Sequence, residues 1–193
     1  EYCTIIICGA KKKGEIRVGM TTNIHEIKNV LNSFELKHFY KQLMDNNWKI
    51  NSSYGEEIYT NFYPTFQVSF QDSIYQPYWF GFFSGIVSSI NSRLRQEKKF
   101  DLGSYSIKNI VLNAQHNSNK FHFHEHRDFR YVIVGFLTPD WDDSWGGELQ
   151  IEDKTIKFKP GNFVLFSGNN LHDAMPVKMG LPYWRISVGI FLK

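Results

Sequence analysis

The sequence predicts a mainly β protein with helices at its N-terminal end (α+β), built around a double-stranded β-helix of the jelly-roll or cupin-like kind. Three observations lead to this prediction. Apolar residues recur with the helical period before residue 100, eight short strand-like segments follow it, and aromatic residues make up 17% of the chain. Large flat side chains at that frequency are typical of β-rich packing.

Two segments before residue 100 have the apolar spacing of helices. Residues 23–47 follow roughly the helical period, and we expect a break near Asn32 and Ser33, where Ser33 could cap a second helix. Residues 78–100 place apolar side chains at spacings of three and four. We interpret both segments as helices that pack on a sheet.

After residue 100, short strand-like segments alternate with turns that contain Gly, Pro, Asn and Asp. The segments are residues 105–115, 120–128, 130–137, 147–153, 155–160, 162–168, 173–179 and 183–192. Eight short strands behind helices suggest a double-stranded β-helix, a barrel that carries sites inside its mouth. We expect a single domain over residues 1–193, with supporting helices and strands in 1–100 and the β-helix core in 101–193.

Composition and charge argue against several classes of protein. The net charge of +3 is too small for bulk attraction to nucleic acid, so we do not expect a nucleic-acid partner. No run of about 18 apolar residues could span a membrane. The two cysteines, Cys3 and Cys8, lie too near the start to staple the fold, and a reducing compartment, hence a cytoplasmic location, is the simpler interpretation.

A row of ionisable residues lies in the stretch FHFHEHRD, residues 121–128. Its members are His122, His124, His126 and Asp128. On one strand all four would face the barrel interior, which is unfavourable unless a partner such as a metal satisfies them. Neighbours on one strand face are roughly 6.6 Å apart, so two can share an ion only where the strand bends. A bend into the following loop favours His126 and Asp128.

A third ligand must come from elsewhere in the chain. The candidates are His25, His38, His116 and His172. His172 lies between two predicted strands, and a β-barrel can bring it beside residues 126–128. Two histidines and one carboxylate on one face, with open coordination positions, form the ligand set of non-haem Fe(II) oxygenases.

Several motifs in a fixed order resemble one family. They are His126-x-Asp128, WGGEL at 145–149, KPGNFVLF at 159–166, HDAMPV at 172–177, and Arg185 in the last strand. In this order they resemble the core of the Fe(II)/2-oxoglutarate-dependent oxygenases of the prolyl-4-hydroxylase type. The resemblance covers roughly residues 105–192, the whole predicted barrel.

The resemblance implies a role for each matching residue. His126, Asp128 and His172 would bind Fe(II). Arg185 would pair with the distal carboxylate of the cosubstrate 2-oxoglutarate, a contact that suits a planar guanidinium. Ser187 would face the same way and could add a hydroxyl donor. With O2 as oxidant, the implied reaction hydroxylates a C–H bond and releases succinate and CO2.

One position departs from the family's pattern. Many relatives have a Tyr in the third barrel strand that reaches the same carboxylate, whereas this chain has Phe136. Another group would have to assist Arg185. Asn113, Gln115 and Tyr131 are the candidates, and the sequence does not choose among them.

Three further residues have open roles. His124 faces the same way as His126 and could contact substrate, support the metal site, or be a packed neutral histidine. Trp145 has a structural role or lines the substrate mouth. We expect His122, further from the strand end, to serve packing.

Three functional hypotheses follow. The first is an Fe(II)/2-oxoglutarate-dependent hydroxylase of a small molecule or amino acid, with a protein prolyl hydroxylase as the alternative. The second is a non-enzymatic cupin-like module that binds a metal or ligand, which a site closed by a fourth ligand such as His124 would favour. The third, a nucleic-acid demethylase, ranks low because those relatives carry RxSxxxR in the last strand, and Phe191 replaces the second arginine.

Overall fold

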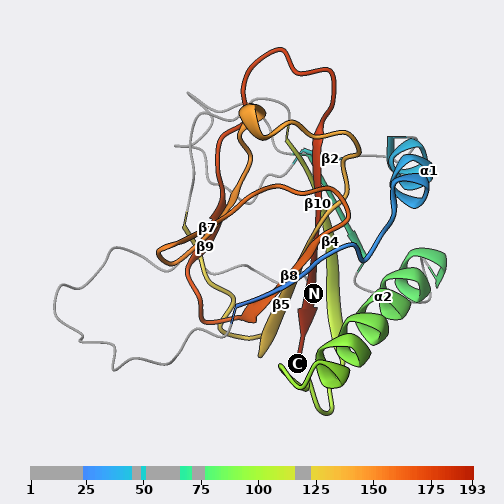
Figure 1. Ribbon diagram of the computed structural model, residues 1–193, viewed down its shortest axis with the longest axis vertical. Helices are drawn as coiled ribbons and strands as arrows, with labels where there is room; N and C mark the ends of the chain where they lie inside the picture. Colours follow the sequence, from blue (N-terminus) through green and yellow to red (C-terminus); the bar gives the residue numbers. More distant parts are fainter. Residues whose placement is uncertain (1–23, 45–48, 51–65, 71–76, 116–122) are drawn as a thin grey trace, which may run out of the picture.

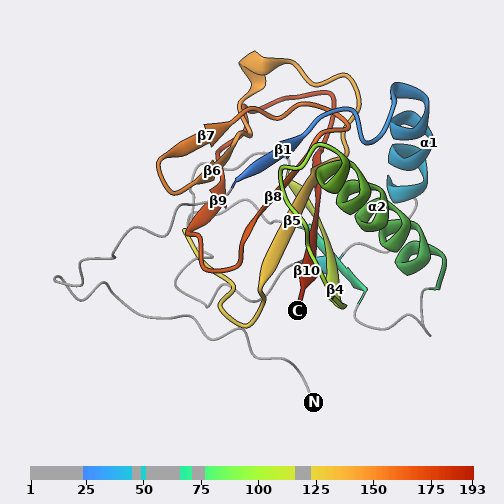
Figure 2. The same ribbon diagram turned by 60° about the horizontal axis from the view of Figure 1, so that its bottom comes forward.

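The computed structural model describes residues 24–44, 49–50, 66–70, 77–115 and 123–193. Within these residues two β-sheets face each other, and two helices cover the outer side of the larger sheet (Figures 1 and 2). This arrangement confirms the predicted mainly β fold. The residues Cys3, Cys8, His116 and His122 lie outside the described ranges.

In the described part of the chain, the larger sheet has the strand order β1-β8-β5-β10-β4-β3-β2 and the smaller one β7-β6-β9. Neighbouring strands are antiparallel throughout. The strands are β1 His25–Ile27, β2 Lys49–Ile50, β3 Phe66–Phe70, β4 Ile107–Gln115, β5 Tyr131–Phe136, β6 Leu149–Ile151, β7 Lys154–Ile156, β8 Phe163–Ser167, β9 His172–Ala174 and β10 Arg185–Leu192. The helices are α1 Ser33–Met44, α2 Pro77–Gln96 and the short 3₁₀ helix η2 Asp143–Trp145.

The larger sheet separates two apolar cores, because side chains along each strand alternate between its faces. On β10 the even-numbered residues from Ile186 to Leu192 belong to the core under α1 and α2. Phe191 instead belongs to the core between the two sheets, together with Phe136 and Phe158. The odd-numbered residues of β10 therefore enter the space between the sheets, where a barrel of this kind holds its site.

The helix predicted over residues 23–47 is wrong in its first half. His25–Ile27 form the strand β1, which pairs with β8 at the edge of the larger sheet. Three residues are too few to show the alternation of a strand, and pairing with β8 decides their conformation. The predicted break is confirmed, because α1 begins at Ser33.

The residue that caps α1 is Asn32 rather than Ser33. Its side-chain oxygen accepts hydrogen bonds from the backbone N–H groups of Phe34 and Glu35, at 2.9 and 3.0 Å. The Glu35 carboxylate accepts in return from the Asn32 N–H at 2.8 Å. This reciprocal pair satisfies N–H groups that the first turn of a helix leaves open. The helix predicted at residues 78–100 is confirmed as α2.

Most strands predicted after residue 100 are confirmed, as β4 to β10. The exception is the segment 120–128, whose described part pairs only through an isolated bridge between His124 and His172. Neither helix α1 nor α2, within the described ranges, has the length and apolar character that crossing a membrane requires.

Gly161 holds the segment before α1 against the larger sheet. Its carbonyl oxygen accepts hydrogen bonds from the N–H groups of Val30 and Leu31, at 2.9 and 3.2 Å. Its φ of 79° favours glycine, and a Cβ at this position would overlap the Leu31 carbonyl oxygen. We expect Gly161→Ala to lower the free energy of unfolding by about 3 kcal/mol or more, measured by chemical denaturation.

Gly103→Ala is the matched control. Gly103 also has a positive φ, 62°, but a Cβ there would meet nothing within 4 Å. Only the backbone cost of about 1 kcal/mol applies to it. Equal losses in the two variants would contradict the role assigned to the Leu31 contact.

Candidate metal and cosubstrate site

Three histidines meet between the two sheets, and we call them the three-histidine cluster: His124, His126 and His172. Each offers a ring nitrogen that lies within 4.8 Å of the nitrogens offered by the other two. The ring centroids are 4.5 Å apart for His124 and His172, 4.9 Å for His124 and His126, and 5.0 Å for His126 and His172. Imidazole nitrogens at this separation can converge on one metal ion.

Backbone hydrogen bonds hold the cluster together. The His124 N–H donates to the His172 carbonyl at 3.1 Å, and the His172 N–H donates to the His124 carbonyl at 2.9 Å. Two residues further on, the His126 N–H donates to the Gly168 carbonyl at 2.7 Å. A segment more than 40 residues away in sequence is thereby fixed beside the first residue of β9.

The orientation of the His172 ring suits metal binding. Its Nδ1 lies 2.9 Å from the Asn170 carbonyl oxygen, which can only accept, so Nδ1 carries the proton and Nε2 keeps its lone pair. The ring is buried against Phe166, at 4.8 Å between centroids. Metal-binding histidines in general donate their other N–H to a carbonyl in this way.

Burial also keeps two members of the cluster neutral. Desolvation, with a smaller contribution from His124, lowers the pKa of His126 to about 4 and that of His172 to about 3. Both imidazoles are therefore unprotonated at pH 7, and that is the form that binds a metal. The donor set thus fits a divalent transition metal.

Asp128 does not join the cluster. It is exposed and lies in a turn in which the Phe129 N–H donates to the His126 carbonyl at 2.9 Å. The strand alternation that would place Asp128 on the same face as His126 ends at this turn. His124, expected from the sequence to contact substrate or support the site, lies in the cluster instead.

Arg185 lies buried in the same interior, with 1% of its surface exposed. Its Nε donates to the Gly147 carbonyl at 2.8 Å, and its Nη1 donates to the Gln115 side-chain oxygen at 3.1 Å and the Ser187 hydroxyl at 3.2 Å. The guanidinium carbon lies 5.1 Å from the Phe158 ring centroid. A Cβ on Gly147 would press on the Arg185 side chain at 2.9 Å, so the Gly-Gly turn makes room for it.

This guanidinium is a buried cation, and the carboxylates of Asp173 and Glu148 act on it through their electrostatic fields. Burial lowers the pKa of Arg185 to about 10 against the opposing fields of Asp173 and Glu148, so the group is charged at pH 7. Among the described residues it forms no ion pair, and its hydrogen bonds involve Nε and Nη1 only. A buried charge is costly without a partner, and a ligand carboxylate would supply one.

The structure distinguishes the residues proposed to assist Arg185. Gln115 and Ser187 contact it directly. Asn113 is paired with Ser187 across β4 and β10, on the same face as Gln115. Tyr131 packs with the core under the helices, on the opposite face of the sheet.

Phe136, at the position where many relatives have a tyrosine, packs in a tilted arrangement against Phe158, at 4.7 Å between ring centroids. It lies in the core between the sheets and offers no hydrogen bond.

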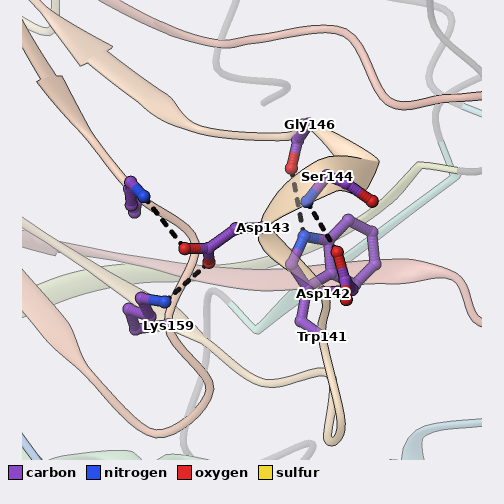
Figure 3. A network of polar contacts seen from close by, with 7 residues as sticks. Trp141, Asp142, Asp143, Ser144, Gly146 and Lys159 are labelled. Atoms are coloured by element: carbon purple, nitrogen blue, oxygen red, sulfur yellow. Dashed lines mark hydrogen bonds and ion pairs between the residues drawn. The ribbon is translucent and has the colours of Figure 1, made fainter.

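The loop after β5 carries Trp145 and is tied down by polar contacts (Figure 3). The Asp143 carboxylate accepts from the Nζ groups of Lys157 and Lys159, at 3.0 and 2.6 Å. Trp141 Nε1 donates to the Gly146 carbonyl at 3.0 Å, which closes the loop on itself.

Beside this loop lies an open cavity of about 520 Å³. Its lining consists of residues 143–146, Glu148 and 176–179, and therefore includes Trp145. The three-histidine cluster and Arg185 are not among the lining residues. We give the buried cluster more weight as the reactive centre, because the cavity holds no comparable set of metal ligands.

The fold is that of the double-stranded β-helix class, and the three-histidine cluster could hold a metal ion. Residues 112–193 match the family model of the 2OG-Fe(II) oxygenase superfamily. The resemblance expected from the sequence motifs is therefore confirmed, and the match indicates an oxygenase dependent on Fe(II), 2-oxoglutarate and O2.

Solved structures share this fold. A 2OG-Fe(II) oxygenase family oxidoreductase from Burkholderia pseudomallei is 14% identical, with a TM-score of 0.63 over 89% of this chain and 85% of that one. A Pseudomonas putida prolyl-4-hydroxylase is 16% identical, with a TM-score of 0.58 over 90% and 94%. A Trichoplax adhaerens prolyl hydroxylase, in complex with a hypoxia inducible factor peptide, is 21% identical, with a TM-score of 0.58 over 89% and 84%.

At these identities the structural similarity shows the fold. No curated protein matches the chain.

The pKa values of the buried histidines make the metal-free protein sensitive to acid. The pKa of His126 is lowered from 6.5 to about 4 on folding, so the unfolded chain takes up a proton first as the pH falls. The contribution of His126 to the unfolding free energy is present above about pH 6.5 and is lost progressively as the pH falls towards the folded-state pKa of about 4. We expect His126 alone to cost about 2 kcal/mol of unfolding free energy between pH 7 and pH 5, measured by urea denaturation. His126→Asn should show a smaller loss over this range, and an equal loss would contradict the assignment.

Proposed function

We propose that the chain hydroxylates an unactivated C–H bond of a small molecule or a free amino acid. One C–H bond becomes C–OH, one atom of O2 enters the product, and the other enters succinate as 2-oxoglutarate loses CO2. The observation that carries the proposal is the buried guanidinium of Arg185 in the same interior as the three-histidine cluster. A cation and a set of metal ligands together suit a cosubstrate that has a carboxylate at each end.

The binding of 2-oxoglutarate is assigned to Arg185 at one end of the cosubstrate. Its Nε and Nη1 are held by Gly147, Gln115 and Ser187, which leaves Nη2 to meet the distal carboxylate. Phe158 lies beside the guanidinium and fixes its plane. An arginine held in this way is ordered before the ligand binds, so less conformational entropy is lost on binding.

The metal is assigned to the three-histidine cluster, which contains His126 and His172, two of the ligands predicted from the sequence. Bound Fe(II) would supply the redox chemistry that activates O2. The protein's own contribution is to keep the imidazoles neutral and oriented, and to surround them with aromatic rings. Phe166 packs on His172, and Phe191 packs on His126 at 4.7 Å between centroids, which keeps bulk water away from the oxidising centre.

The part of the substrate that lies away from the reacting C–H bond is assigned to the open cavity beside Trp145, because the three-histidine cluster does not line this cavity. A cavity of about 520 Å³ is of the size that small ligands occupy. The lining mixes apolar groups such as Trp145 and Met179 with the charged groups of Glu148 and Lys178. A zwitterionic amino acid would match both signs of charge. We expect the protein to act in the cytoplasm, in keeping with its cysteine usage.

A protein prolyl residue is the second candidate substrate. Two of the similar structures are named prolyl hydroxylases, and one of them is in complex with a peptide. The assay therefore includes proline-containing peptides beside free amino acids.

Succinate formation tests the function directly. Purified protein with Fe(II), 2-oxoglutarate and O2 should form succinate in proportion to a hydroxylated product, detected by mass spectrometry across panels of amino acids, small molecules and prolyl peptides. Absence of succinate above the no-enzyme background with every panel would refute the oxygenase proposal. Product formation with prolyl peptides, and with none of the small molecules or amino acids, would identify a protein prolyl residue as the substrate.

Arg185→Gln should weaken 2-oxoglutarate binding by about 100-fold, because a buried charge pair is lost. Calorimetric titration of the metal-loaded protein measures this affinity. Arg130→Gln is the control, since Arg130 is exposed and stacks over Tyr131 on the other side of the sheet. Ser187→Ala, which keeps the charge, should cost only about 3-fold. Unchanged affinity in the correctly folded Arg185 variant would contradict the role given to this residue.

A further inference from the structure

We propose that Asp143 is a positioning residue for the substrate. Held between Lys157 and Lys159, it fixes the Trp145 ring at the open cavity and thereby sets the affinity for the part of the substrate that binds there. The role of the cavity in this inference rests on the proposed function. We call Asp143, Lys157 and Lys159 the loop clamp.

The Asp143 carboxylate binds two lysines at once (Figure 3). Its Oδ2 lies 3.0 Å from the Lys157 Nζ, and its Oδ1 lies 2.6 Å from the Lys159 Nζ. The hydrogen bonds from Lys159 and Lys157 hold the pKa of the Asp143 carboxyl below its usual range, and Asp143 in turn raises the pKa of Lys157. A single exposed ion pair contributes little, whereas a carboxylate with a separate cation on each oxygen forms a small network of defined geometry.

Trp145 lies in the same turn of helix as Asp143. The helix η2 comprises Asp143–Trp145, and the Trp145 N–H donates to the Asp142 carbonyl at 3.0 Å. The Asp142 side chain accepts a further hydrogen bond from the Ser144 N–H at 2.7 Å and caps the turn. Because these bonds close one short turn, a constraint on the side chain of its first residue also constrains the position of its last residue.

The two lysines are held in place because the residue between them is buried. Phe158 is 2% exposed, and its ring lies 4.7 Å from the Trp141 ring and 5.1 Å from the Arg185 guanidinium carbon. Exposure alternates along residues 157–159, so Phe158 faces the core while both lysines reach Asp143 from outside. The clamp therefore ties the Trp145 loop to a segment that also contacts Arg185.

Other contacts of Trp145 join the two walls of the cavity to each other. Its ring lies 5.3 Å from the Trp141 ring and 6.2 Å from the Tyr183 ring, between centroids. Its carbonyl accepts from the Lys178 N–H at 2.9 Å, and Lys178 belongs to the opposite part of the cavity lining. The clamp adds an anchor for these walls on residues 157–159.

Position, and not chemistry, is the contribution that we expect from Asp143. The cavity binds the part of the substrate away from the reacting C–H bond, so a displaced Trp145 ring weakens binding and leaves the reactive centre intact. Loss of the clamp should therefore raise KM with little change in kcat. Because the clamp is ionic and exposed, salt should weaken it in the same way.

Asp143→Asn removes the charge and keeps the shape of the side chain. On the compound of the assay panel with the highest turnover, we expect KM to rise about 5-fold and kcat to change by less than about 2-fold. The wild-type KM should also rise, by about 2-fold, between about 0.05 and about 0.5 M KCl. Asp143→Asn should show a smaller rise over this range, because it has no clamp left to screen.

Lys154→Met is the matched control, because it breaks an exposed ion pair of 3.1 Å with Glu26 at a lysine that does not line the cavity. Its KM should equal that of the wild type. Lys159→Arg keeps the cation and should restore wild-type behaviour. Lys157→Met with Lys159→Met should match Asp143→Asn, and all three changes together should cause no further loss, because they remove one shared network.

Hydrogen exchange follows the loop without turnover. In the metal-loaded protein, peptides that contain Trp145 should exchange about 10-fold faster at this N–H in Asp143→Asn than in the wild type or Lys154→Met, measured by mass spectrometry. Unchanged exchange in Asp143→Asn, or faster exchange with an unchanged KM, would overturn the inference. Faster exchange in a protein that turns over no compound of the panel would instead refute the proposed function, while showing that the clamp holds Trp145.

Discussion

The backbone bridge between His124 and His172 is the contact on which the site depends. It consists of two hydrogen bonds and adds the chain before β5 to the edge of the smaller sheet, next to β9. Without it, the segment would have no fixed register against the larger sheet, and ring nitrogens from distant parts of the chain would not converge. The Gly168 carbonyl then fixes His126, so the cluster is built mostly from backbone geometry. The backbone hydrogen bonds of the sheets therefore determine where the imidazole rings of the cluster lie.

The interior of the barrel combines neutral ligands with one permanent cation. His126 and His172 lose their charge through burial, whereas Arg185 keeps its charge because its intrinsic pKa is far higher. The buried interior therefore combines the positive charge of Arg185 with imidazoles that are neutral. This imbalance favours anionic molecules over neutral ones and gives a physical reason for a dicarboxylate cosubstrate. Gln115 and Ser187 accept hydrogen bonds from Arg185, whereas the Phe136 side chain has no group that could form one.

Much of this could be predicted from the sequence where the local pattern is long. The period of residues 78–100 predicted α2, the strand-like segment 183–192 after a turn predicted β10, and the order of motifs predicted the family. The failures came where tertiary contacts decide. β1 has only three residues, and its conformation depends on pairing with β8. Asn32 caps α1 in place of Ser33 because the Glu35 carboxylate accepts a hydrogen bond from the Asn32 N–H. A bend after Asp128 was expected to keep it beside His126, whereas the turn spans residues 126–129 and leaves Asp128 exposed. The sequence signal for His124 was its spacing of two residues from His126, which places both side chains on one face of an extended segment.

The position of β1 also bears on how such a domain can be inherited. β1 covers the outer edge of β8, and α1 and α2 fill the core behind the larger sheet. The stretch that carries the family match, residues 112–193, begins inside β4 and contains none of these elements. Cut to that stretch, the sheet would present an unpaired edge and a bare apolar face, both of which invite association with other chains. The stretch that matches the family model is therefore shorter than the stretch that builds the complete sheet and its core. A gene fusion or exchange would have to include β1, α1 and α2 together with the motifs.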